Sequence, residues 1–129
     1  IMVPNQIEAE YLTAIKVTDV YSAEKAANIL LNKGVEAVVI KMGSQGAFYA
    51  TASGQGYIPA FKVDVKDTVA AGDAFGSGFA FSYSNSNNFE EAVRFGVAAG
   101  CLSVTVEGAM DSMPSINSVM ELLNTGSVI

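Results

Sequence analysis

The order of helix-type and strand-type segments is the feature that most restricts the fold of this chain. An amphipathic stretch ends at Gly34 and is followed at once by the apolar run 36–41 (EAVVIK). Short runs of this kind, rich in β-branched residues, are typical of buried strands. Strands that alternate with helices predict an α/β layer architecture, in which ligands bind where strands end and helices begin.

The remaining periodicities predict the other elements. A first helix should open at Pro4 and Asn5, and Ser22 should cap a second one. Further strands are expected at 47–51 and 57–63, and helices at about 73–84, 89–106 and 113–123. We expect the apolar stripe of the first helix to face the core, and its members are Ile7, Tyr11, Leu12 and Ile15.

Length and charge restrict the function. The chain has 129 residues, enough for one domain, and carries 7 Lys and Arg against 13 Asp and Glu, a net charge of −6. An acidic surface without a basic stripe disfavours nucleic acid as a partner. The longest uncharged apolar stretch, 95–106, is too short to span a membrane. We therefore expect a soluble cytoplasmic protein.

The residue types also exclude mechanisms. The sequence has one cysteine and no histidine. It therefore has no Ser-His-Asp triad and no imidazole base, and the lone Cys101 cannot form an internal disulfide. Acid–base chemistry must rest mainly on carboxylates, Lys, Tyr or Cys.

The strongest chemical signal is the segment 67–78, DTVAAGDAFGSG. Small residues there let the backbone approach a ligand, and a helix that starts at this point directs free N–H groups and its dipole toward one spot. Such a helix start stabilises the charge on a transferring phosphoryl group, and Asp73 could accept a proton from an attacking hydroxyl. The alternative is an ordinary Asp-capped helix behind a small-residue turn, and the residues alone leave both interpretations open.

The pattern D-T-x-A-A-G-D-x-F is similar to the second signature of the ribokinase-like (phosphofructokinase-B type) carbohydrate kinases. The resemblance implies that the N–H groups of Ala70, Ala71, Gly72 and Asp73 form an anion hole. It also implies that Asp73 is the catalytic base and contacts the sugar.

The segment 3–10 (VPNQIEAE) resembles the family's P-N-x-x-E-A-E segment. The resemblance implies that Asn5 and Glu8 arrange water bound to Mg²⁺, and that Asn5 also binds ATP. The same spacing is that of a helix capping box, and both roles are compatible for Asn5.

Two further segments resemble the family's nucleotide site. The strand and turn 39–46 match its x-x-G-x-x-G turn, and the helix 92–105 matches the wall of its adenine pocket. The ATP-binding positions implied by the resemblance are Asn5, Lys41, Gly43, Gly46, Gly72 and Val97.

The segment 108–114 (GAMDSMP) resembles the family's loop beside a monovalent-cation site. We expect K⁺ to be held there mainly by backbone carbonyl oxygens. The family carries a basic residue where this chain has Glu107, which puts the affinity in question. The matching positions are Asp67, Val69, Ser103, Val106, Gly108 and Ser112.

Together these motifs imply the fold and activity of the family. Residues 1–129 would be the ATP-binding, catalytic C-terminal portion of a three-layer α/β/α sandwich, without the sugar-binding half and lid. The implied reaction is transfer of phosphate from ATP to a primary hydroxyl, with D-ribose to D-ribose 5-phosphate as the first choice. Alternatives are a kinase for fructose, a ketogluconate or a nucleoside, and a non-catalytic nucleotide-binding remnant.

Three expectations follow from an absent sugar-binding half. The chain alone should be inactive. No specific dimer is expected, because the family's dimers usually form through the lid. A cut sheet should expose apolar surface around Val38, Val39 and Ile40.

Overall fold

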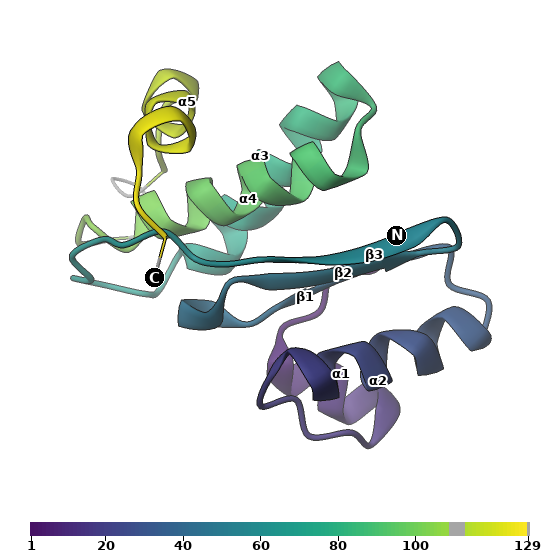
Figure 1. Cartoon of the computed structure of the whole chain (residues 1–129). Helices are drawn as coiled ribbons and strands as arrows, with labels where there is room; N and C mark the ends of the chain where they lie inside the picture. The colour runs from purple at the N-terminus through teal and green to yellow at the C-terminus, as the bar shows by residue number, and fades with distance from the viewer. Residues whose placement is uncertain (109–112, 129) are drawn as a thin grey trace. The chain divides into compact units, whose positions relative to one another are not determined.

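The structure is a computed structural model that describes residues 1–108 and 113–128. The chain divides into two compact units, Ile1–Ile58 and Pro59–Ile129. In Figure 1 the first runs from purple to teal and the second from teal to yellow.

The first unit is built on a three-stranded antiparallel sheet in the order β1 (Ala37–Lys41), β2 (Ala47–Thr51) and β3 (Gly54–Ile58). Met2 and Asn5 form parallel bridges to the free edge of β1. The helices α1 (Gln6–Thr13) and α2 (Val20–Asn32) cover one face of the sheet (Figure 1). The core between them contains small residues of both helices together with Val38, Ile40 and Phe48.

The second unit consists mainly of α3 (Ala71–Ser86), α4 (Phe89–Ser103) and α5 (Ile116–Thr125). Helices α3 and α4 lie against each other along much of their length (Figure 1). Glycines permit this close approach. A Cβ added at Gly78 would lie 2.8 Å from the Cβ of Ala99, and one at Gly96 would lie 3.1 Å from the carbonyl oxygen of Phe75.

The prediction for the buried face of α1 is wrong. Ile7 and Tyr11 are 79% and 90% exposed, whereas Ala9 and Thr13 are buried. Small side chains let α1 lie close to the sheet, and the Thr13 hydroxyl donates to the Ala9 carbonyl at 2.7 Å, so its burial leaves no unpaired donor. Ile15, just after the helix, packs against the core as predicted.

Two further boundaries differ from the prediction in the first unit. The N-cap of α2 is Asp19, and Ser22 is the partner that completes its capping box. The third strand is Gly54–Ile58 and not 57–63, because Pro59 has no N–H with which to continue the ladder. Gly56 pairs with Tyr49 in that strand, and the Tyr49 ring occupies the space that a side chain at Gly56 would need.

The helices of the second unit are shifted by a few residues. Helix α3 begins at Ala71, two residues before the predicted start, and α5 begins at Ile116 with Ser115 as its cap. Helix α4 ends at Ser103 and not near 106. The carbonyl of Val104 accepts the N–H groups of Lys66 and Asp67 at 2.6 and 3.1 Å, so the chain leaves the helix there.

The expectation of exposed apolar surface around 38–40 is also wrong. Val38, Val39 and Ile40 have no exposed surface. Val38 and Ile40 belong to the core shared with α1 and α2, which accounts for the burial of that face of β1.

The packing of α3 on α4 gives a testable pair of substitutions. Gly78→Ala should lower the free energy of unfolding by about 1–3 kcal/mol, because the added methyl group would overlap Ala99. Gly76→Ala is the matched control. It lies in the same helix with no atom within 4 Å of its added Cβ, so it should raise the free energy of unfolding by about 0.5–1 kcal/mol. Urea denaturation monitored through the amide signals of α3 and α4 measures both changes. Equal stabilisation by the two substitutions would contradict this helix packing.

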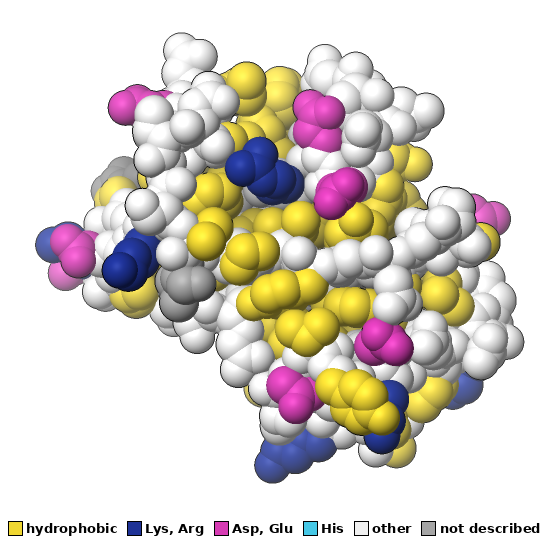
Figure 2. Space-filling model, in the orientation of Figure 1, with side chains coloured by type: hydrophobic (Ala, Val, Ile, Leu, Met, Phe, Trp, Pro, Cys, Tyr) yellow, Lys and Arg dark blue, Asp and Glu magenta, His cyan; other side chains and the backbone are white. Residues whose placement is uncertain are grey.

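The surface carries side chains of both charges. On the face drawn in Figure 2, Lys and Arg side chains are interspersed with Asp and Glu and do not form a continuous basic stripe. No helix among residues 1–108 and 113–128 is both long and apolar enough to cross a membrane.

Candidate active site

The start of α3 is the centre of the predicted catalytic site. Its N-cap, Ala70, has a backbone conformation of φ −110° and ψ 11°, and no side chain caps the helix there. Asp73 occupies the third helical position and is exposed to solvent. An uncapped helix start of this kind keeps N–H groups and the positive end of the dipole available for an anion.

The four N–H groups predicted for the anion hole are not equivalent. The N–H of Ala71 donates to the Thr68 carbonyl at 3.2 Å, whereas Gly72 and Asp73 occupy the second and third helical positions. The first N–H of α3 to pair within the helix is that of Ala74, which donates to the Ala70 carbonyl. Within α3, the N–H groups of Gly72 and Asp73 therefore lie before the first intrahelical pair, where a helix start has free donors.

The carboxylate of Asp67 joins two segments of the predicted cation site. One of its oxygens accepts the N–H of Val69 at 3.0 Å, and the other accepts the N–H of Gly108 at 3.2 Å. These backbone hydrogen bonds, that of Val69 first, hold the pKa of the Asp67 carboxyl below its usual value. The link is therefore complete at neutral pH and weakens only when acid protonates the carboxylate.

The other predicted cation-site residues lie around the same link. Ser103 and Val106 are connected by the long contact of 3.5 Å from the Val106 N–H to the Ser103 carbonyl, just before Gly108. The buried Ser103 hydroxyl donates to the Gly100 carbonyl at 2.8 Å. Ser112 lies outside the described residues.

The remaining predicted phosphate-site residues belong to the first unit. Asn5 and Glu8 form a reciprocal capping box, with the Glu8 N–H donating to the Asn5 side chain at 2.8 Å and the Asn5 N–H donating to the Glu8 carboxylate at 2.9 Å. The parallel bridge between Asn5 and Lys41 brings the start of α1 beside the end of β1. The structure thus places three predicted residues together at one edge of the sheet.

The turn after β1 has the geometry that its glycines predict. Residues Gly43–Gln45 form a short 3₁₀ turn, and Gly43 and Gly46 have φ values of 56° and 85°. Residues other than glycine rarely adopt these φ values. The hydroxyl of Tyr57 on β3 donates to the Gln45 carbonyl in this turn, a contact that the sequence motif did not predict.

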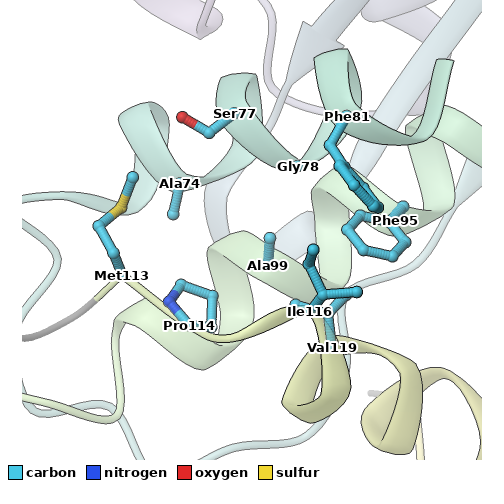
Figure 3. A pocket seen from close by; sticks show the side chains of 10 residues that line it. All are labelled: Ala74, Ser77, Gly78, Phe81, Phe95, Ala99, Met113, Pro114, Ile116 and Val119. Atoms are coloured by element: carbon cyan, nitrogen blue, oxygen red, sulfur yellow. The ribbon is translucent and has the colours of Figure 1, made fainter. Parts of the chain in front are cut away.

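An apolar pocket of about 160 Å³ opens beside the first turns of α3 (Figure 3). Its lining side chains come from α3, from α4 and from the segment 113–119, and Ser77 contributes a hydroxyl. Phe95 and Ala99 line it, whereas Val97, the residue predicted to wall the adenine site, does not and is 4% exposed. The sequence gives no signal for this pocket, because it depends on how three segments pack.

Few of the described side chains are placed to bind a metal ion. Among residues 1–108 and 113–128, no three Cys, Asp or Glu side chains lie close enough to hold a metal ion directly. Asn5 and Glu8 each use one side-chain oxygen in the capping box, and the second Glu8 oxygen has no partner within the described part of the chain. This arrangement fits a divalent ion held through its water molecules.

Comparison with known proteins identifies the family. The family model described as pfkB family carbohydrate kinase matches residues 1–116. The chain is 42% identical over 123 residues to the ribokinase of Haemophilus influenzae and 38% identical over 122 residues to the deoxyribokinase of Salmonella typhi. Each match covers 95% of this chain and 40% of the relative.

Solved structures agree with the family match. The Arabidopsis thaliana ribokinase, solved with ribose and ATP, is 33% identical with a TM-score of 0.85, over 96% of this chain and 41% of that one. The chain therefore belongs to the pfkB family of carbohydrate kinases and has the ribokinase-like α/β fold. It spans about two fifths of the length of the relatives it matches.

Proposed function

We propose that this chain supplies the catalytic and nucleotide-binding part of an ATP-dependent sugar kinase, with D-ribose as the first-choice acceptor. The main support for this proposal is the position of Asp73 at the uncapped start of α3, beside the N–H groups of Gly72 and of Asp73 itself. Asp73 is the carboxylate in the first turn of α3, and the sequence has no histidine that could act as the base in its place.

The proposed reaction is an in-line phosphoryl transfer. The Asp73 carboxylate takes the proton from the sugar's primary hydroxyl as that oxygen bonds to the γ-phosphorus of ATP. The bond from that phosphorus to the β,γ-bridging oxygen breaks, and ADP leaves. The N–H groups at the start of α3 stabilise the negative charge on the transferring group.

The first unit supplies the proposed ATP contacts at Asn5, Lys41 and the 43–46 turn. In the second unit, Gly72 and Val97 are the proposed nucleotide contacts. Asn5 and Glu8 would orient water bound to Mg²⁺. When bound, Mg²⁺ would offset the negative charge of the phosphate groups.

Two experiments test this proposal. Calorimetry should detect binding of a non-hydrolysable ATP analogue to the chain. For catalysis, a chimera in which this chain replaces the matching segment of the H. influenzae ribokinase should release ADP when ribose is added. A chimera that folds and binds the analogue but transfers no phosphate would favour the non-catalytic alternative.

The choice of sugar needs a separate test, because relatives include both a ribokinase and a deoxyribokinase. The natural full-length protein with this sequence should show its highest kcat/KM with D-ribose. 2-Deoxy-D-ribose, D-fructose, a ketogluconate and a nucleoside are the comparison substrates. A higher value with one of these would make that compound the substrate.

We also propose a K⁺ site around the Asp67–Gly108 link. K⁺ should activate the chimera far more than Na⁺ at equal ionic strength, because the larger ion suits a ring of backbone carbonyls. The test compares rates in the two salts for the chimera and for its Asp67→Ala variant. That variant loses the acceptor for the N–H groups of Val69 and Gly108 and should lose the preference. Equal rates in both salts for the unsubstituted chimera would remove the site, with Glu107 the first residue to examine.

A further inference from the structure

The 43–46 turn is held mainly by its own backbone. The Met42 N–H donates to the Gly46 carbonyl at 2.8 Å, and the Gly46 N–H donates to the Gly43 carbonyl at 3.0 Å. No side chain caps the start of the turn, and Gly43 has open space around it. Glycine-rich segments of this kind have many accessible conformations unless another group restrains them.

One side chain does restrain the turn. The hydroxyl of Tyr57 donates to the carbonyl oxygen of Gln45 across twelve residues of sequence. Tyr57 lies on β3, where it pairs in register with Phe48 on β2. This register places the tyrosine on the strand next to the one that leaves the turn.

Tyr57 is not needed to fill the core. Its side chain is 38% exposed, whereas its strand partner Phe48 is 2% exposed. A surface tyrosine hydroxyl can bond to water equally well, so its contact with the Gln45 carbonyl chiefly fixes the orientation of that peptide group.

We propose that Tyr57 is a positioning residue for the nucleotide. Its hydroxyl restrains the 43–46 turn in one conformation and thereby raises the affinity for ATP, without contact with the reacting atoms. The physical basis is preorganisation, because a turn already ordered loses less conformational freedom when the nucleotide binds. The inference rests on the proposed function, in which this turn contacts ATP.

The test is Tyr57→Phe, which removes one oxygen and keeps the ring on β3. Calorimetry with a non-hydrolysable ATP analogue should show a dissociation constant raised roughly threefold to tenfold, the effect of losing about one net hydrogen bond. Amide hydrogen exchange at Gln45 and Gly46, measured without nucleotide, should become faster. In the chimera, the KM for ATP should rise while kcat stays unchanged.

Tyr11→Phe is the matched control, since Tyr11 is 90% exposed and belongs to the same unit. It should change neither affinity nor exchange at the turn. If the unsubstituted chain binds the analogue and Tyr57→Phe binds it equally well, the positioning role is overturned and the proposed function stands. A lower kcat with unchanged KM would also overturn it. If the unsubstituted chain binds no analogue, the proposed function fails and this inference fails with it.

Discussion

Asp73→Asn should lower the kcat of the chimera by about 10²–10⁴, the range typical for loss of a general base. The amide has nearly the size and shape of the carboxylate but cannot accept the hydroxyl proton. Asp73 is exposed and lies in the first turn of α3, so the substitution removes no core contact. The helix should therefore persist. The KM for ATP should change little, because the other proposed nucleotide contacts remain.

The measurement is a coupled ADP-release assay at saturating ribose and ATP. Asp64→Asn is the control, since Asp64 is also an exposed carboxylate of the second unit but lies outside the 67–78 motif. It should leave kcat near that of the unsubstituted chimera. A near-normal kcat for Asp73→Asn would exclude Asp73 as the base and leave it as an ordinary first-turn carboxylate of α3.

The largest effect is expected for the 129-residue chain assayed alone. It should show no ribose-dependent ADP release, because it spans only about two fifths of the relatives it matches. Phosphoryl transfer requires the acceptor hydroxyl to be held against the γ-phosphate. Such positioning supplies roughly 7–11 kcal/mol of the barrier, equivalent to effective molarities of about 10⁵–10⁸ M. A free sugar that diffuses to Asp73 gains none of this advantage.

Addition of the remaining segment of the H. influenzae ribokinase as a separate polypeptide tests the reason for that inactivity. Ribose-dependent ADP release should appear on mixing and should stay absent when the chain carries Asp73→Asn. Release at a normal kcat from the chain alone would show that the sugar site lies within these 129 residues, contrary to the proposal.

Local sequence signals predicted much of the candidate site. The capping box of Asn5 and Glu8 and the glycine turn at 43–46 form where the sequence indicates, and the small-residue start of α3 forms two residues earlier than predicted. Each depends on hydrogen bonds or backbone angles within about four residues, so neighbouring side chains are enough to specify it. The catalytic, nucleotide and cation roles of these residues stay predictions.

One predicted element boundary is wrong because a longer-range contact overrides the local pattern. Helix α4 ends early because loop residues 66 and 67 bond to the Val104 carbonyl. The strand predicted at 57–63 ends at Ile58, in contrast, for a reason that was visible in the sequence, since Pro59 follows it. Pro59 is therefore a local signal that by itself predicts the end of β3.

The sequence by itself therefore determined the family, the order of the α and β elements and the presence of a small-residue helix start, because each follows from motifs and periodicities along the chain. Only the tertiary structure decided which face of α1 is buried, since close packing favoured Ala9 and Thr13 over the larger Ile7 and Tyr11. It alone joined Asp67 to Gly108 and Tyr57 to Gln45. Hydrogen bonds across 41 and 12 residues depend on how strands, helices and loops pack, and no periodicity along the chain encodes that packing.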